Sequence, residues 1–152
     1  MARVAIPGDS NCLLAPSQRR ALEDFYAALR SHDLDLLDGV LTANWEDLPP
    51  APGQVPGPDG LKPVFQMLLQ AFPDLSLEIL EVIAETDRAA VRVLVRGTQR
   101  GPLFGVPPSG RAVQFALHEF HEFEGARLRR TWHMEDLFGL FTQIGAWPPL
   151  RS

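Results

Sequence analysis

The side chains best suited to proton transfer gather in the last third of the chain, in a segment predicted to form a β-hairpin. Its first strand carries His118 and Glu119, and its second strand ends with His133 and Asp136. An imidazole has an unperturbed pKa of about 6.5, so it can accept and return a proton near neutral pH, and a nearby carboxylate can take part in the same exchange. The pattern is typical of a site for acid/base chemistry.

The turn of this hairpin decides which of these side chains face one another. A two-residue turn at 125–126 pairs His118 with His133, whereas a three-residue turn brings Glu119 opposite Thr131. The sequence leaves both registers open, and a β-bulge would reverse the facing locally. His118 and Glu119 are therefore both candidates for the site.

With the two-residue turn, the more apolar face of the hairpin is predicted to meet the helices. His121 is interpreted as a surface or interface residue, although its spacing places it on that face. The more apolar face holds Phe115, Leu117, Glu119, His121, Trp132, Met134 and Asp136, and the other holds His118, Phe120, Thr131 and His133.

Two of the candidates also have other interpretations. Asp136 directly precedes the last predicted helix, where an aspartate commonly accepts the free backbone N–H groups of the first turn. His118 and His133, if they face each other, could bind a metal ion, but no third ligand stands at an identifiable spacing. The sequence therefore predicts no metal site.

Composition and charge limit the classes of protein that fit. The chain has 152 residues, 14 Lys and Arg against 19 Asp and Glu, and a net charge of −5, with no basic stripe to follow a phosphate backbone. No apolar run approaches the ~18–20 residues of a membrane span. Cys12 is the only cysteine, and residues 1–10 lack the apolar core of a signal peptide. We expect a cytoplasmic protein that binds neither nucleic acid nor membrane.

Apolar periodicity predicts helices first and strands afterwards, which is typical of an α+β domain with helices on one face of a curved antiparallel sheet. Residues 1–16 are predicted to be a flexible arm, and 17–152 a single domain whose first helix is capped by Ser17. The predicted order is a helix from residue 17, a short helix over 34–41, a proline-rich loop over 48–60, a helix over 61–72, strands around 75–79, 91–95, 112–123 and 127–135, and a short helix over 137–144.

Three segments of this pattern resemble the SnoaL-like polyketide cyclases of the NTF2-like superfamily. They are residues 70–75 (QAFPDL), residues 105–111 (GVPPSGR), and Trp132 together with residues 136–145 (DLFGLFTQIG). The resemblance implies a cone of N-terminal helices packed on a strongly bent antiparallel sheet. It also implies a single-domain enzyme without a cofactor, and a homodimer formed through the open face of the sheet.

The resemblance implies a reaction as well, namely ring closure by intramolecular aldol condensation of a small hydrophobic or aromatic molecule that contains carbonyl groups. In these cyclases an aspartate directly after a tryptophan is the acid/base group, and a histidine directly before it gives support. The matching residues here are His133 and Thr131. We therefore expect His133 or Asp136 as the base, with His118, Glu119 or Gln99 as the hydrogen-bond donor.

A pocket for a flat organic ligand is lined mainly by apolar and aromatic side chains with a few polar groups. Two alternatives to aldol chemistry remain, since one fold can host many functions. One is a domain that binds a ligand or a partner without chemistry, and the other is hydrolysis or isomerisation by the same groups. The predicted ligand-binding residues are Tyr26, Trp45, Asp47, Phe65, Gln99, Phe115 and Trp132.

Overall fold

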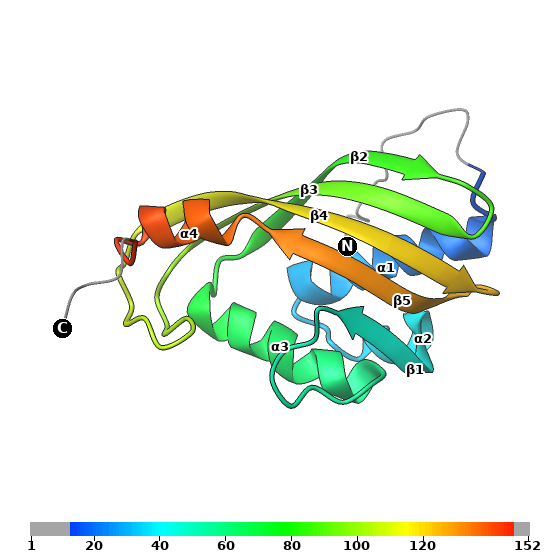
Figure 1. The fold of residues 1–152 in the computed structure, drawn as a ribbon, viewed down its shortest axis with the longest axis horizontal. Helices are drawn as coiled ribbons and strands as arrows, with labels where there is room; N and C mark the ends of the chain where they lie inside the picture. The colour runs from blue at the N-terminus through cyan, green and yellow to red at the C-terminus, as the bar shows by residue number, and fades with distance from the viewer. Residues whose placement is uncertain (1–12, 148–152) are drawn as a thin grey trace.

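The computed structural model describes residues 13–147, which form helices packed on a five-stranded sheet. Figure 1 shows α1, α2 and α3 on one side of the bent sheet and α4 at its end. The strand order across the sheet is β1-β5-β4-β3-β2. The elements are α1 (Pro16–Arg30), α2 (Leu36–Val40), β1 (Leu41–Leu48), α3 (Pro58–Ala71), β2 (Ser76–Ala84), β3 (Arg88–Thr98), β4 (Ala112–Glu124), β5 (Arg127–Glu135) and α4 (Leu137–Gln143).

The predicted α+β fold is confirmed, with one difference in the sheet. The sequence did not predict β1, which joins the sheet edge parallel to β5 and makes the sheet mixed. Its residues lack a clean alternation of buried and exposed side chains, and its pairing with β5 shifts register between Leu41 and Glu46. A strand of this kind gives no period-two signal in the sequence.

Two predicted helix starts are wrong. Ser17 does not cap α1: the helix begins at Pro16, and the Gln18 side chain accepts the N–H of Ala15 at 2.9 Å. Helix α3 begins at Pro58 instead of residue 61, so that Pro63 lies inside the helix. Proline at the first helical position is favoured because its missing N–H would have no partner there.

The core lies between the inner face of the sheet and the helices. On β3 the buried residues Val91, Val93 and Val95 alternate with more exposed ones, and from α1 Leu22 and Phe25 pack into the same cluster.

No helix within residues 13–147 is long and apolar enough to cross a membrane. Most of the predicted N-terminal arm, residues 1–12, lies outside the described residues.

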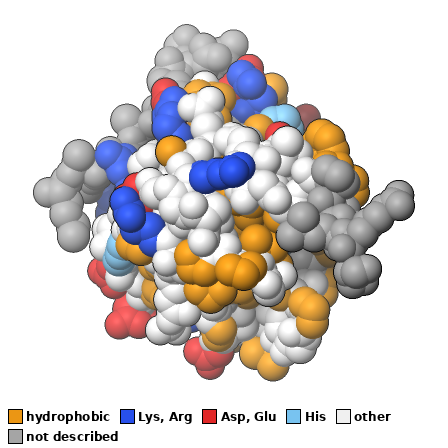
Figure 2. Space-filling view, turned by 90° about the vertical axis from the view of Figure 1, so that its left-hand side faces the viewer, with side chains coloured by type: hydrophobic (Ala, Val, Ile, Leu, Met, Phe, Trp, Pro, Cys, Tyr) orange, Lys and Arg blue, Asp and Glu red, His pale blue; other side chains and the backbone are white. Residues whose placement is uncertain are grey.

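Several aromatic side chains are exposed at one end of the molecule. Figure 2 looks onto the end that holds α4 and shows hydrophobic side chains gathered there. Phe138 and Trp147 are 65% and 51% exposed, and their ring centroids lie 5.6 Å apart. Phe104, from the loop after β3, is 61% exposed and lies 6.3 Å from Phe141 of α4. The contact between Phe104 and Phe141 packs this loop against α4.

Candidate functional site

The β4–β5 hairpin has the two-residue turn of one predicted register, but it also contains a bulge. The register shifts by one residue between Phe123, which pairs with Leu128, and Glu122, which pairs with Arg130. Beyond the shift, Glu119 pairs with His133, and His121 pairs with Thr131. Because the bulge reverses the facing of β5 relative to β4, all four of these side chains lie on the helix side of the sheet.

The bulge also overturns several predicted positions. Trp132, expected on the inner face, is 39% exposed on the outer face, and His121, expected at the surface, is 1% exposed. His118 pairs with Met134 and is exposed on the outer face, so it does not face His133. The pair on which a metal site would have depended therefore does not form. Only Glu119 of the two first-strand candidates lies near His133.

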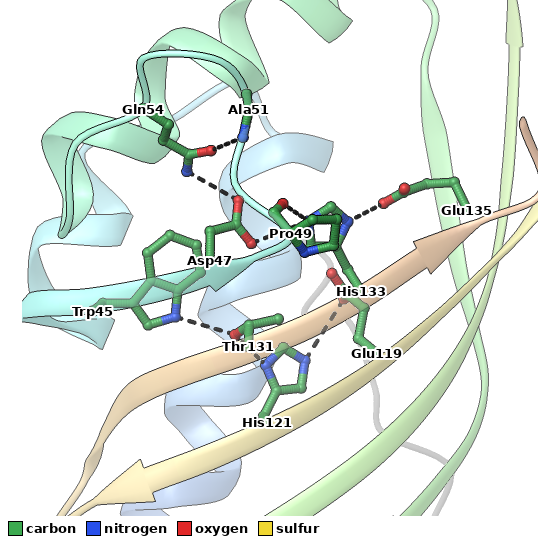
Figure 3. Close-up of polar contacts among 10 residues, drawn as sticks. All are labelled: Trp45, Asp47, Pro49, Ala51, Gln54, Glu119, His121, Thr131, His133 and Glu135. Atoms are coloured by element: carbon green, nitrogen blue, oxygen red, sulfur yellow. Dashed lines mark hydrogen bonds and ion pairs between the residues drawn. The ribbon is translucent and has the colours of Figure 1, made fainter.

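His133 is enclosed by three oxygen acceptors (Figure 3). Its Nδ1 lies 2.6 Å from Glu135 Oε1, and its Nε2 lies 2.8 Å from the Pro49 carbonyl oxygen and 3.3 Å from Asp47 Oδ1. The hydrogen bond to Glu135, its charge and that of Asp47 raise the pKa of His133 to about 9, although burial opposes the shift. The ring is an imidazolium at neutral pH, which favours a role as donor and not as base.

Asp47 lies at the end of β1, beside this imidazolium. Its Oδ2 accepts a hydrogen bond of 2.9 Å from Gln54 Nε2, in the loop before α3. Burial is the main cause that raises the pKa of Asp47, and the negative charge of Glu119 adds to it; the Gln54 hydrogen bond and the His133 charge act in the opposite direction. Asp47 is therefore close enough to Glu119 for the two carboxylates to repel each other.

Glu119 presents a carboxylate with one free oxygen on this face. The residue is 7% exposed, and Oε2 accepts the hydroxyl proton of Tyr26 at 2.5 Å. Among the described residues, none donates a hydrogen bond to Oε1. The site thus combines an unpaired carboxylate oxygen with a neighbouring imidazolium, which is a suitable arrangement for moving a proton.

Asp136, a predicted base, has a structural position. Its Oδ1 accepts the backbone N–H of Gly139 at 2.9 Å, so the N-cap interpretation is confirmed. Its side chain is exposed at the start of α4. Within residues 13–147, the Asp136 carboxylate forms no hydrogen bond or ion pair with Asp47, Glu119 or His133.

Gln99, a predicted donor to a ligand, is fully buried, and its amide holds the loop between β3 and β4. Nε2 lies 3.2 to 3.4 Å from the carbonyl oxygens of Gly101, Val106 and Pro107, and Oε1 accepts the N–H of Ser109 at 3.0 Å. The amide is used by the protein itself.

We therefore expect Gln99→Leu to lower the free energy of unfolding by about 1–3 kcal/mol, because it removes the side-chain partner of the buried Gly101 carbonyl and of the half-buried Ser109 N–H. Urea unfolding measures this. Gln66→Leu, on the exposed face of α3, is the matched control and should change the free energy of unfolding by less than about 0.5 kcal/mol. Equal stability of the two variants would contradict the role of Gln99.

The remaining predicted ligand-binding residues are core side chains. Tyr26, Trp45, Phe65 and Phe115 are between 1% and 9% exposed, and all belong to the main apolar cluster. Their contact with a ligand stays a prediction.

Glu135 and Gln54 are functional residues that were not predicted from the sequence. A signal for Glu135 was present: residues two apart on a strand share a face, so Glu135 had to lie beside His133 whatever the register. Gln54 had no such signal, because it reaches Asp47 from an irregular loop.

Comparison with known proteins identifies the family of the chain. The sequence model of a family described as SnoaL-like polyketide cyclase matches residues 19–144. No curated protein is similar enough in sequence to register as a relative.

Solved structures give a closer comparison. TsrD from Streptomyces laurentii is 31% identical with a TM-score of 0.79, covering 86% of this chain and 96% of its own. AclR from Streptomyces galilaeus, a candidate hydroxylase, is 27% identical with a TM-score of 0.74, covering 89% and 85%. A SnoaL-like polyketide cyclase from Agrobacterium tumefaciens is 25% identical with a TM-score of 0.72, covering 86% and 100%.

Proposed function

The chain belongs to the SnoaL-like polyketide cyclase family, and we propose on this basis that it is an acid/base enzyme without a cofactor. Its reaction would be abstraction of a proton next to a carbonyl group of a small hydrophobic or aromatic substrate, followed by intramolecular aldol condensation. The observation that supports this most is the pairing of Glu119 with His133 on the inner face of the sheet. Directly paired strand residues have Cβ atoms about 4.5–5.5 Å apart, so both groups can reach one substrate.

In the proposed reaction, Glu119 Oε1 takes a proton from the carbon beside the carbonyl group. The electron pair of the broken C–H bond forms the enolate, whose oxygen becomes negative. The imidazolium of His133 stabilises this charge, with the substrate oxygen replacing the Pro49 carbonyl as acceptor of the Nε2 proton. The enolate carbon then attacks a second carbonyl of the same molecule, and the resulting alkoxide receives the proton held by Glu119.

Exchange with deuterated water tests the first step without knowledge of the natural substrate. A panel of acyclic β-diketones and β-keto esters is incubated in D2O with the protein, and NMR follows loss of the proton from the carbon between the carbonyls. We expect faster exchange than in buffer for at least one aromatic or long-chain member. Exchange at the buffer rate across the panel would overturn the proposal in favour of a binding domain.

We also propose that a second copy of the chain covers the outer face of the sheet. An apolar row crosses all five strands there, because register places these residues side by side. Phe120 is 60% exposed and Ile83 65%. The row consists of Ile83, Ala90, Phe120, Trp132 and Leu48, and on one side it is flanked by Arg88, Glu122, Arg130 and Glu46.

Sedimentation equilibrium measures this association. The unmodified protein should be a dimer, and Phe120→Glu should be a monomer, because a charge in the centre of the row cannot be buried without a partner. Val55→Glu, which changes an apolar residue of similar exposure (55%) in the loop before α3, should remain dimeric. A monomeric unmodified protein would contradict the proposal.

A further inference from the structure

We propose that Trp45, Thr131, His121 and Tyr26 form a one-directional chain of hydrogen-bond donors that positions Glu119. In this chain His121 is neutral and carries its proton on Nε2. Tyr26 and the residues behind it are positioning residues, and their effect on activity rests on the proposed role of Glu119 as the base. The protonation of His121 does not depend on that role.

This chain of hydrogen bonds connects four secondary-structure elements through buried side chains. Trp45 Nε1 of β1 donates to Thr131 Oγ1 of β5 at 3.1 Å, and Thr131 Oγ1 lies 2.9 Å from His121 Nδ1 of β4. His121 Nε2 lies 2.9 Å from Tyr26 Oη of α1, which donates to Glu119 Oε2. Figure 3 shows the part of the chain from Trp45 to His121. Trp45, Thr131, His121 and Tyr26 are each at most 2% exposed.

The direction of the chain follows from its two ends. An indole nitrogen only donates, so Thr131 Oγ1 accepts from Trp45 and has its own proton left to give. Its one other partner among the described residues is His121 Nδ1, which must then be an acceptor. His121 therefore carries its proton on Nε2 and donates it to Tyr26 Oη, which leaves the Tyr26 hydroxyl proton for Glu119.

The reverse direction leaves a proton without a partner. If Tyr26 donated to Nε2, His121 would donate from Nδ1 to Thr131, and the Thr131 hydroxyl proton would have no acceptor in this network. An unpaired polar group at a buried position costs about 1–3 kcal/mol. Trp45 thus sets the direction of every bond as far as Glu119, although it lies four hydrogen bonds away.

Packing holds the chain in place. The ring of Phe25 meets the rings of His121 and Tyr26 edge-to-face, with centroids 5.1 and 5.2 Å apart. The fixed Tyr26 hydroxyl occupies Oε2 of Glu119, so that Oε1 is the oxygen left for a substrate proton. Tyr26 also separates Glu119 from His121, whose Nε2 is 3.6 Å from Oε2.

NMR of protein labelled with 15N-histidine tests the direction of the chain at neutral pH. Long-range 1H–15N correlations distinguish a protonated ring nitrogen from a bare one, and the His121 signals are those that disappear in His121→Gln. We expect a protonated Nε2 and a bare Nδ1. A proton on Nδ1, or on both nitrogens, would overturn the proposal whether or not the protein has any activity.

The deuterium exchange assay tests positioning, with Thr131→Val and Thr131→Ser as a matched pair. Valine keeps the shape of threonine but removes the donor to His121, whereas serine keeps the hydroxyl. We expect the exchange rate to fall about tenfold in Thr131→Val, since small misplacement of a reacting group is costly, and to stay within about twofold in Thr131→Ser. Equal rates in the two variants would contradict positioning. If the unmodified protein does not accelerate deuterium exchange, the proposed function is contradicted, and the NMR result on His121 still stands.

Discussion

Replacement of Glu119 by Gln is expected to lower the rate of enolate formation by about 10²–10⁴-fold, the usual contribution of a positioned general base. The amide has the shape of the carboxylate, and its oxygen can still accept the hydroxyl proton of Tyr26. It cannot take a proton from carbon, so the chemistry is lost while the contacts are kept. The measurement is deuterium exchange into the most responsive β-dicarbonyl compound at fixed pH.

The control for this variant lies on the same strand. Glu124 is exposed at the end of β4, and Glu124→Gln makes the same change of charge away from the site. We expect it to exchange at the unmodified rate. Thermal unfolding of both variants shows that they remain folded. If Glu119→Gln keeps its rate, Glu119 is not the base, and Asp47 becomes the next residue to test, because burial already raises its pKa.

Sequence periodicity was enough to predict most of the fold. β3 shows why: Val91, Val93 and Val95 are buried and Arg92 is exposed, so the pattern of the strand is visible in the residue types. β1 could not be predicted in this way, because it pairs irregularly at a sheet edge and lies between a helix and a proline-rich loop. Because β1 was not predicted, it was also not apparent that the side chains of Trp45 and Asp47 lie on the same face of the sheet as His133.

The site was harder to predict, since it depends on a single bulge. One shifted residue pair brings Glu119 beside His133 and moves Trp132 to the outer face. No residue type in the sequence indicates that shift. The two-residue turn alone predicted that His118 would pair with His133 and that Trp132 would lie on the inner face. The charge of His133 was equally hidden. An isolated imidazole would suit a base, but contacts from Glu135 and Asp47 make this one an imidazolium.

The pH dependence of the reaction is expected to follow the loss of charge from the His133 imidazolium. The folded-state pKa of His133 is raised from 6.5 to about 9, chiefly by the hydrogen bond to Glu135. The charged form is complete well below pH 9 and is lost as the pH rises through that value. Activity that needs the charge should therefore fall on the alkaline side around pH 9. The contact between His133 and Glu135 should make its full contribution to the free energy of unfolding below pH 6.5. That contribution should be lost as the pH rises through about 9.

Glu135→Gln removes the largest cause of the raised pKa while it keeps a hydrogen-bond acceptor next to Nδ1. We expect the alkaline limb of the exchange rate to move down by roughly 1–2 pH units, since Asp47 and the Pro49 carbonyl still favour the charged form. Near pH 8.5 the variant should then be about 3- to 25-fold slower than the unmodified protein, with little difference at pH 6. Profiles from pH 6 to 10 measure the shift, and Glu85→Gln, an exposed change of the same kind, should leave the limb in place. An alkaline limb that does not respond to Glu135→Gln would mean that His133 does not carry the charge on which the reaction depends.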